Sequence, residues 1–254
     1  MKDGELGTLR CLKLKKSFGG IVALGGVDLE FPAAGIVAII GPNGAGKTTL
    51  LNILTGFLQA DTGQILFDKH ILNQVAPHRI ARLGIARTFQ DLRLSKLVPV
   101  LENVMLACPN QSGENPFRAL FRMGLAKEEA RNRESAMRWL KFVGLEDKAH
   151  ELAGELSYGQ QKLLSLACVL ATEARILLLD EPVAGVHPEM ISKILGFLGE
   201  LREQGRLVVF VEHDISAVRQ VADTVIVMDD GRIIAQGNPA QVLERPEIID
   251  AYVG

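Results

Sequence analysis

Cysteines are scarce in this sequence, and it has no long apolar run. The three cysteines, Cys11, Cys108 and Cys168, are odd in number and widely spaced, and no Cys-x-x-Cys motif occurs. This pattern argues against a disulfide framework or a cysteine zinc site and favours small buried side chains in a reducing compartment. Apolar runs such as 176–179 are far shorter than the roughly 20 residues that a membrane-spanning helix requires. We therefore expect a chain that does not cross a membrane itself.

The sequence also has no excess of charge of either sign. Its 28 Lys and Arg residues face 30 Asp and Glu residues, which gives a formal net charge of -2. A strongly basic surface is typical of nucleic-acid binding, and a long acidic run is typical of a disordered tail. Neither is present, so we expect no nucleic-acid partner. The 254 residues, 48% of them hydrophobic, are ample for a core that needs no disulfides or metals.

The spacing of apolar residues predicts two kinds of sheet. Residues 27–31 alternate apolar and acidic side chains, which is typical of an antiparallel strand with one face in water. Continuous apolar runs, typical of parallel strands buried on both faces, occupy 36–40, 176–179, 207–211 and 225–228. Helical stretches separate these runs, so we predict an α/β fold with a mostly parallel sheet in its core and an N-terminal antiparallel β subdomain. Asp229-Asp230-Gly231 predicts a tight turn into a late hairpin.

Residues 91–155 have a different character, with few strand signals and mostly charged helical sequence such as 125–143. We expect this segment to form an α-helical subdomain inserted into the α/β core. Segments 1–90 and 156–254 would then form that core, and the whole chain, 1–254, would be a single domain. There is no internal repeat, and each motif described below occurs once.

A phosphate-binding motif follows the first buried run. It matches G-x-x-x-x-G-K-[ST] at every fixed position with Gly41, Pro42, Asn43, Gly44, Ala45, Gly46, Lys47 and Thr48. Glycines let backbone N–H groups close around phosphate oxygens, and the positive end of the helix through Thr49 faces the same phosphates. Lys47 would contact the β- and γ-phosphates of ATP, and the Thr48 hydroxyl is the expected Mg²⁺ ligand. A chance glycine-rich turn is the alternative, but the buried strand before the motif and the helix after it favour phosphate binding.

Two acids follow the buried run at 176–179. Asp180 and Glu181 would lie at the tip of a strand beside the phosphate loop, where α/β sheets bind ligands. Asp180 is expected to bind Mg²⁺ through a water molecule, and Glu181 to orient and deprotonate the attacking water. Adjacent strand residues point to opposite faces, so the two carboxylates can take separate roles. The alternative is a solvated acidic turn, which the complete phosphate loop makes less favoured.

The stretch 156–161, LSYGQQ, resembles the signature motif of the ABC ATPase family. Ser157 is a good N-cap residue, and the helix behind it is apolar nearly all round, which predicts a buried, rigid helix. Because an open helix N-terminus attracts anions, the resemblance implies that Ser157, Tyr158, Gly159 and Gln160 contact ATP. Plain capping of a core helix is the alternative.

Three further residues resemble functional positions of this family. Gln90 resembles the loop glutamine that contacts Mg²⁺ and the attacking water and that links the core to the helical subdomain. His213 resembles the switch histidine that hydrogen-bonds to the γ-phosphate, although a lone histidine at a strand end is more often a surface residue. Phe18 resembles the aromatic residue that stacks on adenine, with a core position as the alternative. The resemblance thus makes Glu181, Gln90 and His213 the predicted catalytic residues.

The resemblance covers essentially the whole chain and implies an arrangement of subunits. Two such domains face head to tail, with each ATP between the phosphate loop of one and the signature of the other, so the partner would be a second copy or a paralogue. Permease subunits and, indirectly, a solute-binding protein are the other implied partners, which places the chain in the cytoplasm on the inner face of the cell membrane. Two positions depart from the family: Tyr158 stands where many members have glycine, and His187 where Asp or Asn is frequent.

Several stretches resemble the ATPases of branched-chain amino acid importers in particular, namely 18–20, 101–106, 157–159 and 237–254. The resemblance implies an ATPase that powers amino-acid import through partner permeases. Importers of urea or amides, and exporters, remain alternatives because this subunit does not contact the cargo. A soluble ABC protein acting on ribosomes or DNA usually has two cassettes, and this chain has one of each motif. A nucleotide sensor that does not hydrolyse ATP is the last alternative, against which Glu181, Gln90 and His213 argue.

Overall fold

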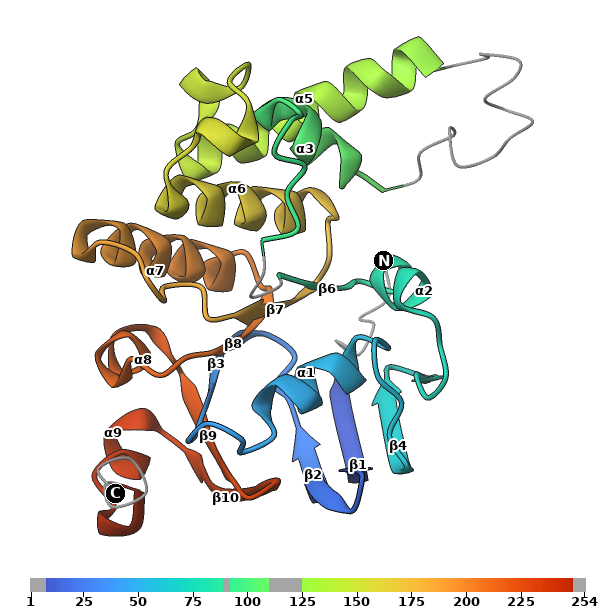
Figure 1. Ribbon diagram of the computed structural model, residues 1–254, viewed down its shortest axis with the longest axis vertical. Helices are drawn as coiled ribbons and strands as arrows, with labels where there is room; N and C mark the ends of the chain where they lie inside the picture. Colours follow the sequence, from blue (N-terminus) through green and yellow to red (C-terminus); the bar gives the residue numbers. More distant parts are fainter. Residues whose placement is uncertain (1–7, 89–91, 110–124, 249–254) are drawn as a thin grey trace. The chain divides into compact units, whose positions relative to one another are not determined.

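The computed structural model describes residues 8–88, 92–109 and 125–248, which belong to two compact units (Figure 1). The first unit comprises Met1–Arg87, Arg175–Ala184 and Pro188–Gly254, and the second comprises Thr88–Ala174 and Gly185–His187. The segment 91–155, predicted to be helical, lies within the second unit. The predicted division differs from this one at 88–90, 156–174 and 185–187, which were predicted to belong to the core and which fall in the second unit.

The first unit begins with the predicted antiparallel sheet. Its strands, in the order β2-β1-β4-β5, are Ile21–Glu30, Leu9–Phe18, Thr62–Phe67 and His70–Ile71. All neighbouring pairs are antiparallel. Leu9, Cys11 and Leu14 of β1 are buried in the core, whereas Leu12 and Lys13 face solvent. The extra residue between Cys11 and Leu14 reflects a register shift in the pairing with β2, as a bulge produces.

A six-stranded, mostly parallel sheet forms the centre of the first unit (Figure 1). In the order β10-β9-β3-β8-β7-β6, its strands are Arg232–Gly237, Thr224–Asp229, Gly35–Ile40, Leu207–Val211, Ile176–Asp180 and Ile85–Arg87. Only β9 and β10 pair antiparallel, and they form the predicted hairpin. Asp230 and Gly231 both have positive φ, 47° and 71°, as a two-residue hairpin turn of this hand requires. The predicted fold class is confirmed.

Helices cover both faces of the parallel sheet. They are α1 Lys47–Leu54, α2 Pro77–Arg82, α7 Pro188–Glu203, α8 Ile215–Val221 and α9 Pro239–Val242. Val37 and Ile39 of β3 share one core with Leu50 of α1 and with the antiparallel sheet. Ala38 and Ile40 point the other way and are also completely buried, and α7 contacts β3 and β8. Burial on both faces explains why these strands are continuous apolar runs.

The second unit is helical in its described part. It contains α3 Val100–Leu106, α5 Leu125–Val143, α6 Tyr158–Ala171 and two short 3-10 turns, Glu146–Lys148 and Ala153–Glu155. The three helices contact one another in pairs. The buried Asn103 side chain accepts a hydrogen bond from the Ser95 N–H and donates to the carbonyls of Ser95, Val98 and Pro99, which fixes the segment before α3.

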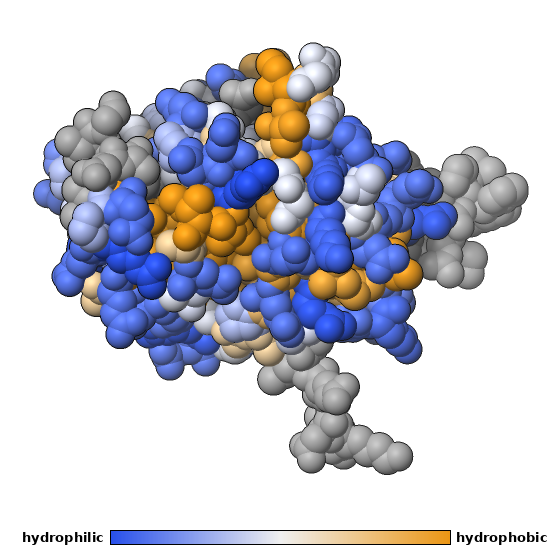
Figure 2. Space-filling model, turned by 90° about the horizontal axis from the view of Figure 1, so that it is seen from below, coloured by the Kyte–Doolittle hydropathy of each residue, from blue (hydrophilic) through white to orange (hydrophobic). Residues whose placement is uncertain are grey.

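The surface of the molecule is mostly hydrophilic in the view of Figure 2, with apolar side chains gathered among the polar ones. The exposed apolar residues include Ile21 and Val22 at the start of β2, which are 75% and 54% exposed. Among the described residues, no helix combines the length and the apolar character that a membrane span requires.

Candidate functional site

The predicted phosphate loop connects β3 to α1 at the carboxyl end of the parallel sheet. Gly41, Gly44 and Gly46 all have positive φ, at 152°, 86° and 94°. A Cβ atom on Gly41 would overlap the Met228 carbonyl oxygen, and one on Gly46 would overlap that of Ala23. Packing and backbone conformation therefore both demand glycine at the first and last of these positions. Alternation of left-handed and right-handed backbone is the arrangement that turns successive N–H groups toward an anion.

Lys47, the first residue of α1, spans this loop. Its side chain is nearly buried, and its Nζ donates hydrogen bonds to the carbonyl oxygens of Gly41 and Pro42 at 2.6 and 2.8 Å. Burial lowers the pKa of the Lys47 ammonium from its usual value, and the charges of Glu181 and Asp180 offset part of this effect. A buried ammonium that donates to two neutral carbonyl oxygens suits an incoming phosphate oxygen.

The phosphate loop also contacts the turn between β9 and β10. Gly231 donates its N–H to the carbonyl of Ala45 at 3.3 Å and accepts a hydrogen bond from the Gly25 N–H at 2.8 Å. This turn was predicted, but its contact with the phosphate loop was not. The order of strands in the sheet, which places β9 next to β3, brings the two segments together.

Asp180 ends β7 and is paired with an arginine that the sequence analysis missed. The Arg87 guanidinium, at the end of β6, donates to Asp180 Oδ2 at 2.7 Å and to Asn52 Oδ1 at 2.6 Å. The side chains of Arg87 and Asp180 are only 4% and 3% exposed. The pair therefore ties the end of β7 to helix α1. The only hint of this pair in the sequence was an arginine directly after the apolar residues of the short strand Ile85–Arg87.

Glu181 and His213 were predicted separately, and the structure brings them together. Glu181 Oε1 lies 3.3 Å from His213 Nε2, at the ends of the neighbouring strands β7 and β8. Glu181 has φ 48°, a conformation that is uncommon for residues other than glycine. Its N–H donates to the Val211 carbonyl at 3.0 Å, which holds the turn against β8. Gln90 lies outside the described residues.

Three other residues predicted to contact the nucleotide or its metal lie in the first unit. Thr48 is exposed and Thr49 half-buried in the first turn of α1, after the loop. Phe18 ends β1 and is 48% exposed, with the Lys16 ammonium 5.4 Å from its ring centroid. An exposed aromatic ring can stack on a base, so this role for Phe18 stays a prediction.

The predicted signature lies in the second unit, at the start of α6. Ser157 is the N-cap: its Oγ accepts the Gln160 N–H at 3.4 Å, and Gln160 Oε1 accepts the Ser157 N–H at 2.9 Å. This reciprocal pair is a capping box. Gly159 follows Tyr158, whose ring is half exposed. The Tyr158 ring lies so close to Gly185 that a Cβ there would meet it at 3.3 Å.

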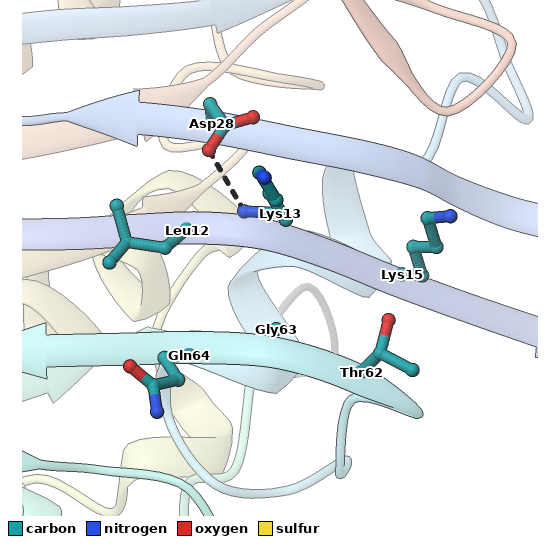
Figure 3. Close-up of a pocket in the computed structure, with 7 residues that line it drawn as sticks. All are labelled: Leu12, Lys13, Lys15, Asp28, Thr62, Gly63 and Gln64. Atoms are coloured by element: carbon teal, nitrogen blue, oxygen red, sulfur yellow. Dashed lines mark hydrogen bonds between the residues drawn. The ribbon is translucent and has the colours of Figure 1, made fainter.

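Two hollows elsewhere in the first unit contain none of the predicted residues. The first, of about 540 Å³, lies on the solvent-facing side of the antiparallel sheet and is lined by Leu12, Lys13, Lys15, Asp28, Thr62, Gly63 and Gln64 (Figure 3). Asp28 accepts a hydrogen bond from the Lys13 N–H there at 2.9 Å. The second, of about 320 Å³, lies between the end of α1 and the segment before α2. The first is lined by exposed side chains and the second by uncharged residues.

A family model described as "ABC transporter" matches residues 24–184. The chain is 38% identical over 243 residues to the high-affinity branched-chain amino acid transport ATP-binding protein BraF of Pseudomonas aeruginosa, with 95% of each chain covered. It is also 38% identical over 245 residues to LivG of Escherichia coli, which has the same description and the same coverage.

Solved structures of ATP-binding cassettes are similar as well. A nucleotide-free cassette from an ABC transporter has a TM-score of 0.85 at 35% identity and covers 98% of this chain and 99% of its own. A dimeric cassette in a post-hydrolysis state, bound to ADP and phosphate, has a TM-score of 0.77 at 28% identity and covers 91% of this chain and 98% of its own.

Proposed function

The chain belongs to the ABC transporter family, and on that basis we propose that it is the ATP-hydrolysing subunit of an importer for branched-chain amino acids. Two bacterial relatives described as high-affinity branched-chain amino acid transport ATP-binding proteins match 95% of this chain. The proposed domain organisation is that of the sequence analysis, with residues 91–155 as the helical subdomain.

The observation that carries the proposal is the contact between Glu181 and His213 beside the phosphate loop. Glu181 would accept a proton from the attacking water, and His213 would hydrogen-bond to the γ-phosphate, since both follow strands whose carboxyl ends border the loop. A carboxylate that is 22% exposed remains accessible to a water molecule. A chain that only sensed ATP would need no acid at this position.

The residues around the loop fit ATP with Mg²⁺. Lys47 and the loop N–H groups would bind the β- and γ-phosphates, and Phe18 would stack on adenine. Hydroxyl, carboxylate and amide oxygens are ligands that Mg²⁺ prefers, and Thr48, Asp180 and Gln90 would provide one of each kind. Bound there, Mg²⁺ would neutralise charge on the phosphates. The hydrogen bond that the Arg87 guanidinium donates to Asp180 Oδ2 fixes the position of this carboxyl group.

Pairing of two chains would complete the site. A related cassette is dimeric with ADP and phosphate bound, which supports the same pairing here with a second copy or a paralogue. Residues 157–160 of one chain would face the γ-phosphate bound to the other, because a capped helix N-terminus attracts anions. ATP would then favour the closed pair and hydrolysis would release it. The segment 91–155 would pass this motion to permease subunits at the inner face of the membrane. A solute-binding protein would deliver cargo to the permease from the opposite side of the membrane.

Replacing Glu181 with Gln tests the hydrolytic part of the proposal. Phosphate release by the purified chain with Mg·ATP should fall by about 10²–10⁴-fold, because a general base is lost. Glu200→Gln changes an exposed acid on α7 and should leave turnover unchanged. Undiminished phosphate release by the Glu181→Gln protein would refute the role of this acid.

Cargo is tested separately, by uptake. Cells that lack their own importer should accumulate labelled leucine when they carry this chain with its permeases and binding protein. Hydrolysis without leucine uptake would instead favour an importer of urea or amides, or an exporter.

A further inference from the structure

One buried acid in the first unit is not used by the proposed reaction. Glu212 lies between the end of β8 and His213 and is only 2% exposed. Its Oε1 accepts the Val183 N–H at 2.8 Å, and its Oε2 accepts the His213 N–H at 3.2 Å. Burial of a carboxyl group is costly unless its oxygens are hydrogen-bonded, and here these two N–H groups offset that cost.

The two N–H groups belong to the two segments that carry the proposed catalytic pair. Val183 follows Glu181 by two residues, and the other N–H is that of His213 itself. One side chain therefore fixes both backbone segments at the point where Glu181 Oε1 and His213 Nε2 lie 3.3 Å apart.

The conformation of Glu181 makes such a clamp necessary. A non-glycine residue at φ 48° is strained and persists only where its surroundings enforce it. The Val211 carbonyl fixes the N–H of Glu181, and Glu212 fixes the N–H of Val183 on the other side of the turn. The left-handed turn is thus held at both ends.

We propose that Glu212 is a positioning residue that sets the distance between Glu181 and His213 by clamping their backbone segments. This inference rests on the proposed function of that pair. The side chain of Glu212 is buried and its two oxygens accept backbone N–H groups, so its role is one of positioning. Glu212 acts by aligning Glu181, the proposed base, with His213, which is proposed to contact the γ-phosphate.

The test uses Glu212→Gln in the full-length chain. An amide keeps the size of the side chain but has one acceptor oxygen, and its NH₂ group would face an N–H donor. We expect kcat to fall about tenfold, as for loss of one charge-assisted hydrogen bond, with KM for ATP changed less than about twofold. Asp223→Asn is the matched control, since Asp223 Oδ2 accepts the Ile36 N–H at 2.8 Å at the opposite end of the sheet, and it should leave kcat unchanged.

A double-mutant cycle with His213→Ala separates positioning from mere stability. If Glu212 acts through the pair, then Glu212→Gln should lower the residual turnover of the His213→Ala protein less than about twofold. An equal fold-loss in both backgrounds, or an unchanged kcat in the single variant, overturns the proposal. Should Glu212→Gln fail to fold, Glu212→Asp takes its place, because the shorter side chain cannot reach both N–H groups.

Failure of this inference is distinct from failure of the proposed function. A wild-type chain that releases no phosphate, or a Glu181→Gln chain that loses none of its turnover, contradicts the proposed function. Normal hydrolysis that depends on Glu181 but not on Glu212 contradicts only the clamp.

Discussion

Arg87 shows how much a single side chain contributes to the site. Its ion pair with Asp180 is buried on both sides, and its second hydrogen bond reaches Asn52 on α1. Arg87→Met would leave the Asp180 carboxylate buried without its cation, so the free energy of unfolding should fall by about 3–5 kcal/mol. Urea denaturation measures this change.

The control for Arg87 is an arginine in an exposed pair. Arg202 contacts Asp223 at 3.1 Å with side chains 39% and 45% exposed, and Arg202→Met should cost less than about 1 kcal/mol. Equal losses in the two variants would mean that burial of the Arg87 pair is not the cause. The double variant Arg87→Met, Asp180→Asn should recover part of the stability, because the buried Asp180 charge is then removed together with its partner.

At the scale of elements, α6 combines a structural and a proposed functional role at one residue. Ser157 caps this helix, whose far side is buried in the second unit, and the same N-terminus is proposed to face phosphate. Ser157→Ala should lower the free energy of unfolding by about 1 kcal/mol through loss of the cap. Ser157→Asp should keep that stability, because Asp also caps, but should abolish ATP-dependent pairing, because its charge repels the γ-phosphate. Thermal unfolding and light scattering measure the two effects.

A cap of the same kind on another helix controls for stability alone. Asn238 Oδ1 accepts the Ala240 N–H at 2.9 Å at the start of α9. Asn238→Ala should weaken that helix and leave pairing intact. Normal ATP-dependent pairing of the Ser157→Asp protein would show that α6 does not face a phosphate.

At the scale of the whole molecule, the proposal requires two chains to complete one site. The chain has a mass of 27.6 kDa, so the Glu181→Gln protein with Mg·ATP should elute at twice that mass, because bound ATP is not consumed. Removal of Mg²⁺ with a chelator should return the single chain. Size-exclusion chromatography with light scattering measures the mass directly.

The matched control for pairing is the double variant Lys47→Ala, Glu181→Gln. It lacks the ammonium that spans the phosphate loop, so it should stay at 27.6 kDa with ATP present. A Glu181→Gln chain that never pairs, with its permease and a paralogous cassette supplied, would contradict the head-to-tail arrangement.

Features that depend on neighbours along the chain could be predicted from the sequence by itself. Glycines at Gly41 and Gly46 indicate a positive φ, Ser157 before an apolar helix indicates a cap, and Asp230-Gly231 indicates a hairpin. Each of these requirements acts within a few residues, and the structure contains all of them. The continuous apolar runs likewise predicted strands buried on both faces, because that burial excludes polar residues from every position.

The contacts between strands were decided only by the tertiary structure. Arg87 meets Asp180 from 93 residues away, His213 meets Glu181, and Glu212 clamps Val183, since β6, β7 and β8 lie side by side in the sheet. Apolar runs of similar composition do not specify which strand lies next to which. Strand order depends on the packing of the whole sheet against its helices, and side chains that meet at the ends of neighbouring strands can be identified only once that order is known.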